Sequence, residues 1–122
     1  LAGLVQSDPG KREFIGISVL KNNLSVEEEV RQLIPVKTNN YTILHDYHFD
    51  GYAKYNNELI RFMNDWHRAT GIPTDFVYTG KLCFAANSLV QKKFFPEGSR
   101  LLLMHSGGLS GNASLKKGTL IF

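Results

Sequence analysis

Short strand-like runs alternate with amphipathic helical segments along this chain, and that alternation is the strongest constraint on its fold. Mostly apolar runs of strand type cover 13–20, 41–45 and 100–105. Apolar side chains at helical spacing cover 26–34, 59–66 and 82–90, and residues 1–5 have the character of a helix end. Strands that alternate with helices form parallel sheets with helices packed against them. The sequence therefore predicts an α/β fold with a mostly parallel sheet.

Turn and cap residues indicate where several of these elements begin and end. Ser25 with Glu28 forms a capping box that predicts a helix start, and that helix is expected to end before Pro35. The Pro9-Gly10 pair is expected to stop the first helix, and Gly71 to stop the one over 59–66. The run over 100–105 is the clearest candidate for a buried strand, and it leads directly into the glycine turn at 106–108.

Composition excludes several classes of function. The chain has 122 residues, of which 43% are hydrophobic, and its 14 basic and 11 acidic residues give a net charge of +3. The basic residues are scattered, so the concentrated footprint of a nucleic-acid-binding protein is missing. No apolar run approaches membrane length. The single cysteine, Cys83, excludes an internal disulfide, which fits a reducing, cytoplasmic location. Its apolar neighbours in a helical segment predict a buried structural thiol.

Two glycine-containing turns are the candidates for a ligand site, because ligands of open parallel sheets bind beyond the carboxyl ends of the strands. One is Thr79-Gly80 and the other is Ser106-Gly107-Gly108. The second turn fits either a phosphate cradle or a plain tight turn. His45 and His48 have the spacing of a loop chelate, but no further pair completes a metal site, and no metal is expected.

Three blocks of the chain together resemble a known enzyme family. They are Asp46-Tyr47-His48-Phe49-Asp50-Gly51-Tyr52-Ala53, Tyr78-Thr79-Gly80-Lys81 and His105-Ser106-Gly107-Gly108. In this order they resemble the C-terminal part of the D-cysteine desulfhydrase and 1-aminocyclopropane-1-carboxylate deaminase family. The resemblance extends from Leu1 to about Ser114. These enzymes use pyridoxal phosphate and have the tryptophan synthase β-subunit fold (fold type II). The resemblance therefore implies that residues 1–122 form a three-layer α/β/α portion of the large domain, with a mostly parallel sheet.

The resemblance also implies roles for individual residues. The partner of the pyridine nitrogen is expected to be Thr79 or Ser106, a choice that the sequence leaves open, and Gly107 and Gly108 complete the cofactor turn. Tyr78 and Tyr52 match two tyrosines beside the substrate, where they transfer protons or position it. The family's Schiff-base lysine and phosphate loop lie in an N-terminal portion absent from this chain. None of the lysines present is expected to occupy an apolar pocket.

The substrate expectation depends on the turn at Thr79. Tyr-Thr-Gly-Lys is similar to the desulfhydrase branch, whereas the deaminase branch resembles Tyr-Glu-Gly-Lys. This favours β-elimination from D-cysteine over deamination of 1-aminocyclopropane-1-carboxylate or another D-amino acid. Ala53 and Ser106 depart from the family's usual Gly and Thr, which bears on substrate choice. A homodimer would suit the family. A phosphate-binding module without catalysis and an inactive homologue are the alternatives.

Overall fold

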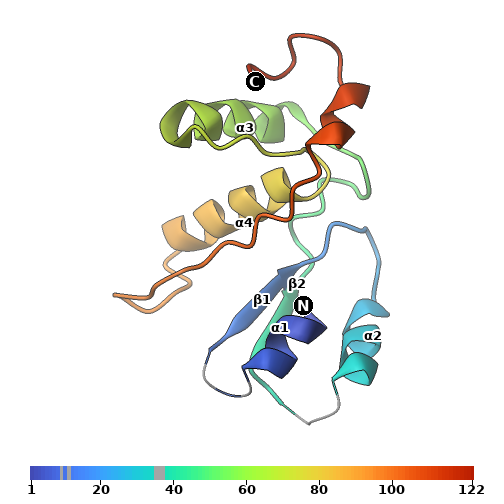
Figure 1. Cartoon of the computed structure of the whole chain (residues 1–122), viewed down its shortest axis with the longest axis vertical. Coiled ribbons are helices and arrows are strands. Elements are labelled where there is room, and N and C mark those ends of the chain that lie inside the picture. Colours follow the sequence, from blue (N-terminus) through green and yellow to red (C-terminus); the bar gives the residue numbers. More distant parts are fainter. Residues whose placement is uncertain (9, 11, 35–37) are drawn as a thin grey trace.

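The computed structural model describes residues 1–8, 10, 12–34 and 38–122. Helices and strands follow one another in the order α1 (Ala2–Ser7), β1 (Phe14–Ile17), α2 (Val26–Leu33), β2 (Tyr41–Leu44), α3 (Asn57–Thr70) and α4 (Thr79–Gln91). A short 3-10 helix, η1 (Leu109–Ser114), completes the set. Figure 1 shows α1, α2 and both strands in one half of the molecule and α3, α4 and η1 in the other.

The two strands confirm the α/β character that the sequence predicts. β1 and β2 pair in parallel, in a register that runs from Phe14 opposite Tyr41 to Ile17 opposite Leu44. A parallel pair needs a crossover connection, and α2 is the helix of that connection. Within the described residues the sheet consists of these two strands. Together with α2 they form a small α/β unit.

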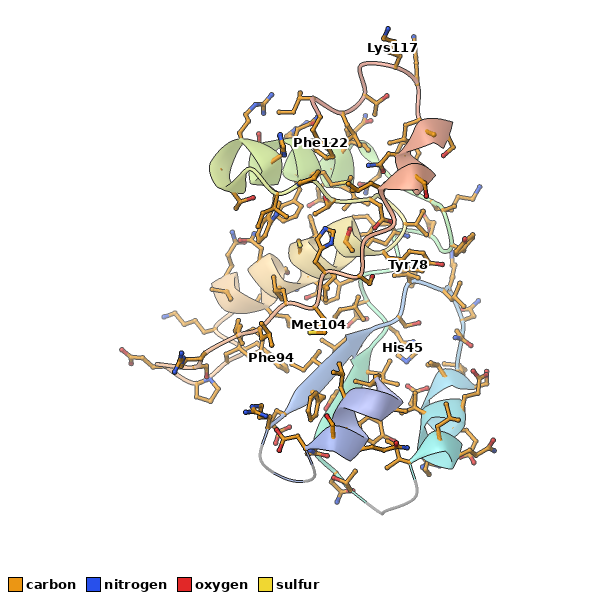
Figure 2. The ribbon with its side chains drawn as sticks, viewed as in Figure 1. His45, Tyr78, Phe94, Met104, Lys117 and Phe122 are labelled. Atoms are coloured by element: carbon orange, nitrogen blue, oxygen red, sulfur yellow. The ribbon has the colours of Figure 1, made fainter. Side chains whose placement is uncertain are left out.

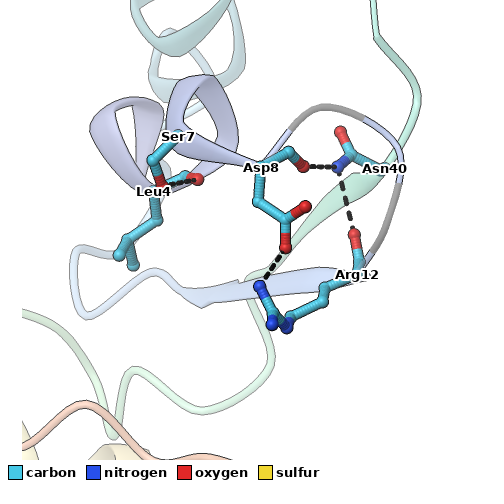
Figure 3. Close-up of polar contacts among 5 residues, drawn as sticks. All are labelled: Leu4, Ser7, Asp8, Arg12 and Asn40. Carbon is cyan, nitrogen blue, oxygen red and sulfur yellow. Dashed lines mark hydrogen bonds and ion pairs between the residues drawn. The ribbon is translucent and has the colours of Figure 1, made fainter.

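Side-chain hydrogen bonds join the end of α1 to the start of both strands (Figure 3). The Asn40 side chain donates to the carbonyl oxygens of Asp8 and Arg12, at 3.2 and 3.0 Å. The Arg12 guanidinium in turn pairs with the Asp8 carboxylate, which is buried. Asn40 itself is buried immediately before β2, so its two donated bonds satisfy a side-chain amide that is removed from water. One amide thereby joins Asp8 and Arg12 to the start of β2.

Two hydrophobic clusters meet at the Phe84 ring on α4. One contains the buried side chains Leu59, Met63, Phe76 and Val77, and the other contains Tyr47, Ala85 and Leu89. Phe84 packs against both, with its ring centroid 4.9 Å from that of Phe49 and 5.2 Å from that of Phe62. α4 therefore lies between α3 and the sheet, as Figure 1 shows. This burial fixes the start of α4, where the candidate site lies.

The sequence correctly predicts both long helices. α3 begins at the side chain of Asn56, which accepts a hydrogen bond from the Leu59 amide, and it ends at Gly71 in the left-handed conformation (φ 71°). The Cys83 thiol is 4% exposed, as the apolar surroundings in the sequence predict. None of the helices in the described ranges combines the length and the apolar character needed to cross a bilayer.

The strand predicted over 100–105 is wrong. This segment has no regular structure, and Leu101, Leu102 and Met104 are 47%, 84% and 55% exposed. It runs back along α4 as an extended stretch, with Met104 labelled in Figure 2. A strand needs hydrogen-bonding partners at a sheet edge, and no described strand lies beside this segment. Its apolar residues therefore do not produce a strand by themselves.

The capping box at Ser25 does not form as predicted either. α2 does begin at Val26, but the Ser25 hydroxyl donates to Glu29 Oε1 at 2.7 Å and makes no bond to the backbone of the first turn. Ser25 has helical backbone angles (φ −81°, ψ −15°), which turn its side chain away from the cap position. The expected stops at Pro9 and Pro35 lie outside the described residues.

Gly80 offers a test of the packing at the start of α4. A Cβ on Gly80 would lie 2.7 Å from the Asp75 carbonyl oxygen and 2.9 Å from Met63 Sδ. Because the Asp75 carbonyl is backbone and cannot move aside cheaply, Gly80→Ala should destabilise the protein by about 1–3 kcal/mol. Gly3→Ala is the matched control, since α1 is open at that position, and it should be neutral or slightly stabilising. Urea unfolding of both variants measures the difference; equal midpoints would contradict this account.

Candidate active site

The buried carboxylate of Asp75 organises the first turn of α4. Asp75 Oδ1 accepts the amide hydrogens of Val77 and Tyr78 at 2.9 and 2.7 Å. Its Oδ2 accepts the amide of Thr79 at 2.9 Å. The first amides of a helix have no partners within the helix, so a carboxylate placed there satisfies them and interacts favourably with the helix dipole. Asp75 therefore caps the turn over 76–78 that leads into α4, and it fixes the backbone that carries Tyr78 and Thr79.

The Thr79 hydroxyl is fully engaged by the same residue. Thr79 Oγ1 donates its proton to Asp75 Oδ2 at 2.6 Å and accepts the Asp75 amide hydrogen at 2.8 Å. Its side chain is 1% exposed. A hydroxyl has one proton to donate, so Thr79 has none left for a further acceptor.

Tyr78 and Tyr52 form an exposed aromatic pair above this turn. Their ring centroids are 6.0 Å apart at an interplanar angle of 64°, and the two residues are 45% and 58% exposed. Hydrogen bonding to the Tyr52 phenol, followed by partial desolvation, raises the pKa of Tyr78 above its usual value. Both effects favour the neutral phenol, so Tyr78 stays protonated at neutral pH. The fold thus brings together two tyrosines that are 26 positions apart in the sequence.

Lys81 occupies an enclosed site that the sequence did not predict, although its immediate surroundings are polar and not the apolar pocket that was excluded. Its side chain is fully buried, at 0% exposure, on the first turn of α4. The ammonium donates to the carbonyl oxygens of His48 and Gly51, both at 2.8 Å. Desolvation lowers the pKa of Lys81, and the charge of Asp75 partly opposes this effect. The enclosure is polar at its centre, which is why an apolar pattern in the sequence did not indicate it.

The glycine turn at 106–108 lies against the same carboxylate. A Cβ on Gly108 would be 3.3 Å from Asp75 Oδ2, and Gly107 and Gly108 both have positive φ, at 86° and 90°. The His105 ring accepts the Gly107 amide hydrogen at 3.2 Å, and its other nitrogen contacts the Pro73 carbonyl oxygen at 2.9 Å. Ser106 is exposed. These contacts form a tight turn that directs the Gly107 amide back to its own chain.

Asn112 in η1 holds this turn in place. Its side-chain amide donates to the Thr74 carbonyl at 2.9 Å and accepts the Phe76 amide hydrogen at 3.2 Å. A side-chain amide that meets both groups of a backbone segment acts like a short strand pairing. The segments 73–79 and 105–112 are thereby joined on both sides of Asp75.

The two histidines considered as a metal pair have separate partners. His45 Nε2 lies 2.6 Å from Glu27 Oε1, and this hydrogen bond lowers the pKa of Glu27. His48 Nδ1 accepts the Asp50 amide hydrogen at 3.0 Å. Among the described residues, no group of three or more His, Cys, Asp or Glu side chains is placed to hold a metal ion. A cavity of about 430 Å³ adjoins His48 and Phe84, but Tyr78 and Ser106 do not line it.

Two residues of this site are missing from the sequence-based prediction. Asp75 had a signal, because an acidic residue shortly before an apolar helix is a common helix start. Lys81 had none, since a lysine in an amphipathic helix has the same sequence context whether its ammonium meets water or buried carbonyls. The predicted residues Tyr52, Tyr78, Thr79, Gly107 and Gly108 all lie on segments that Asp75 and Lys81 bring together.

Comparison with known proteins identifies the relatives of this chain. It is 30% identical over 119 residues to the 1-aminocyclopropane-1-carboxylate deaminase of Rhizobium radiobacter, which covers 88% of this chain and 35% of that protein. It is 32% identical over 108 residues to the enzyme of that name from a Bradyrhizobium species, covering 77% of this chain and 31% of the relative. The chain is similar to the C-terminal part of these deaminases.

The match concerns one part of the family's proteins. The Rhizobium rhizogenes deaminase is 33% identical over 100 residues, which is 82% of this chain and 29% of that protein. The chain thus spans about a third of the length of the curated relatives it matches, in their C-terminal part. No family model matches the chain, and no solved structure matches it either. Its relation to the deaminases therefore rests on these sequence similarities.

The tyrosine pair gives a prediction for pH titration. Tyr52→Phe removes the neighbouring phenol that is the largest cause of the raised pKa of Tyr78, so this pKa should fall towards its usual value. NMR titration of ¹³C-labelled tyrosine follows each phenol separately. Tyr55→Phe is the control, because the Tyr55 ring packs on Phe76 instead, at 5.2 Å, and it should leave the Tyr78 titration unchanged. An unchanged Tyr78 titration in Tyr52→Phe would contradict the coupling.

The burial of Cys83 gives a second prediction. Burial raises the pKa of its thiol to about 11. At pH 8 only about one thiol in a thousand is then ionised, and the thiolate is the reactive form. Iodoacetamide should leave Cys83 unmodified in the native protein and alkylate it in guanidinium chloride, as peptide mass spectrometry would detect. Rapid native alkylation would mean that α4 opens readily.

Proposed function

We propose that the protein carrying this chain is a pyridoxal-phosphate-dependent lyase that eliminates sulfide from D-cysteine and yields pyruvate and ammonia. Similarity to these deaminases supports a reaction at a small amino acid. The observation that carries the proposal is the Asp75-capped turn, which presents Tyr78 beside Tyr52 while committing Thr79 to the interior. A threonine in this turn favours the desulfhydrase branch over the deaminase branch.

The residues of the site fit the pyridine ring of this cofactor. When bound, pyridoxal phosphate draws electrons from a carbanion at the substrate Cα. Ser106 is exposed at the edge of the turn, so its hydroxyl is available to a ring nitrogen. The Thr79 hydroxyl has already donated its proton to Asp75. We therefore assign the contact with the pyridine nitrogen to Ser106, and the wall of the ring site to Gly107 and Gly108.

The tyrosine pair is assigned to proton transfer and substrate positioning. The raised pKa of Tyr78 keeps its phenol neutral at neutral pH, so it is suited to donating a proton or a hydrogen bond. The same property opposes a role as a phenolate nucleophile. A proton donor beside the substrate suits this elimination, because protonation of the departing sulfur assists cleavage of its bond to Cβ. Tyr52, whose ring centroid lies 6.0 Å from that of Tyr78, is assigned to positioning the substrate.

The lysine that holds the cofactor is assigned to a part of the protein outside this chain. Lys81 is buried, but its Nζ is bonded to the carbonyl oxygens of His48 and Gly51 and faces no open site. We further propose that residues 1–122 belong to the three-layer large domain of the catalytic fold, in a cytoplasmic homodimer. The curated relatives are about three times as long as this chain, which supports a catalytic fold completed by further residues.

A second activity, deamination of 1-aminocyclopropane-1-carboxylate, has one observation in its favour. The three relatives described above carry that name. The two reactions are separated by their products, because ring opening and deamination yield 2-oxobutanoate and ammonia, whereas D-cysteine yields pyruvate, ammonia and sulfide. Release of sulfide and pyruvate from D-cysteine, with no 2-oxobutanoate from the cyclopropane substrate, supports the desulfhydrase. The opposite result overturns that assignment in favour of the deaminase.

The decisive first experiment is a visible absorption spectrum of the full-length protein with pyridoxal phosphate, before and after D-cysteine. A cofactor band that changes on adding D-cysteine, together with pyruvate release, supports the proposed enzyme. A phosphate-binding module without catalysis predicts binding of inorganic phosphate and no spectral response to an amino acid. The bond from the Gly107 amide to His105 disfavours that module, because this amide is not available to a phosphate oxygen.

Replacement of Tyr78 tests the proposed chemistry. Tyr78→Phe should lower kcat with D-cysteine by about a hundredfold or more, since a positioned general acid contributes that much, while the cofactor spectrum stays unchanged. Tyr55→Phe is the matched control, because Tyr55 is also 45% exposed but lies on Phe76. Full activity in Tyr78→Phe would remove Tyr78 from the reaction.

A further inference from the structure

The loop that carries Tyr52 has an unfavourable backbone conformation. Phe49, Asp50 and Ala53 have positive φ angles of 50°, 68° and 51°, and Gly51 has a φ of 122°. Residues with side chains avoid this region, and each such residue costs of order 1 kcal/mol or more unless its surroundings impose it. Some contact must therefore hold this loop in its observed shape. Lys21 reaches Asp50 at 3.2 Å, but both side chains of that ion pair are exposed, and such pairs contribute little.

Lys81 supplies a buried, charged contact to this loop, in addition to the packing of Phe49 on Phe84. Its ammonium bridges the carbonyl oxygens of His48 and Gly51, at 2.8 Å each, and so encloses Phe49 and Asp50, two of the residues with positive φ. Tyr52 follows Gly51 directly. Lys81 lies three residues after Tyr78, on the turn that Asp75 caps. One buried side chain thus connects the backbone that carries Tyr52 to the helix turn next to Tyr78.

We propose that Lys81 is a positioning residue, whose ammonium holds the loop 48–51 against α4 and so places the Tyr52 phenol beside Tyr78. A positively charged donor suits this role because hydrogen bonds from a charged group are stronger than neutral ones. Both acceptors are backbone carbonyls, so the contact fixes the course of the chain. The functional part of this inference rests on the proposed function, in which the tyrosine pair acts on the substrate.

The test uses the full-length protein and the variants Lys81→Met, Tyr52→Phe and their combination. Methionine keeps the length and much of the apolar shape of lysine but removes the donors. Lys54→Met is the control, because Lys54 is an exposed lysine on the same loop. Lys81→Met should lower kcat with D-cysteine by about tenfold to a hundredfold, because misplacing a catalytic group by about 1 Å has effects of that size. Lys54→Met should leave kcat unchanged.

The double variant separates positioning from general stabilisation. If Lys81 acts through Tyr52, adding Lys81→Met to Tyr52→Phe should cause no further loss of kcat. In NMR titrations, Lys81→Met should also move the pKa of Tyr78 in the same direction as Tyr52→Phe does. Losses that multiply in the double variant, or an unmoved Tyr78 titration in folded Lys81→Met, would overturn the proposal. If Lys81→Met does not fold, Lys81→Gln, which keeps neutral donors, takes its place in the same cycle.

The two proposals fail in different ways. If the wild-type protein converts neither D-cysteine nor the cyclopropane substrate, the proposed function is wrong, and the Tyr78 titration alone still decides the role of Lys81. If the wild-type protein is active but the Tyr78 titration ignores Lys81, the positioning role is wrong and the proposed function stands.

Discussion

The candidate active site depends on one buried carboxylate, that of Asp75. Its two oxygens accept three amide hydrogens and the Thr79 hydroxyl, which fixes the first turn of α4. A buried carboxylate is tolerated only where donors surround it, and this helix start provides them. The same carboxylate lies against Gly108, and its charge opposes the lowering of the Lys81 pKa by desolvation. Three segments of the chain therefore meet around this carboxylate.

Around that carboxylate, side chains that bond to backbone join segments distant in the sequence. Lys81 holds the loop at 48–51, and Asn112 holds the segment that precedes α4. These bonds fix the course of the chain, while Tyr52, Tyr78 and Ser106 stay exposed. The arrangement suits a site where reacting groups must meet a ligand on a rigid support. It also explains why the turn at 106–108 keeps its place without lying in a regular strand.

The sequence predicts the elements whose signals are local. The apolar spacing of α3 and α4, the stop at Gly71 and the buried Cys83 agree with the structure. The strand expected over 100–105 does not form, because strand formation depends on a neighbouring edge that a single segment cannot specify. The paired tyrosines could be selected from motifs, but their contact with each other comes from a loop folded through left-handed angles.

By itself the sequence determined the helices, the α/β character and the motifs that relate this chain to the deaminases. Those features follow from side-chain periodicity and from residue identity, which are properties of neighbouring positions. Only the tertiary structure decided that Thr79 is committed to Asp75 and that Lys81 lies buried beneath Tyr52. A hydroxyl or an ammonium has the same hydrogen-bonding chemistry in any sequence. Its partner depends on which segments the hydrophobic core brings within hydrogen-bonding distance.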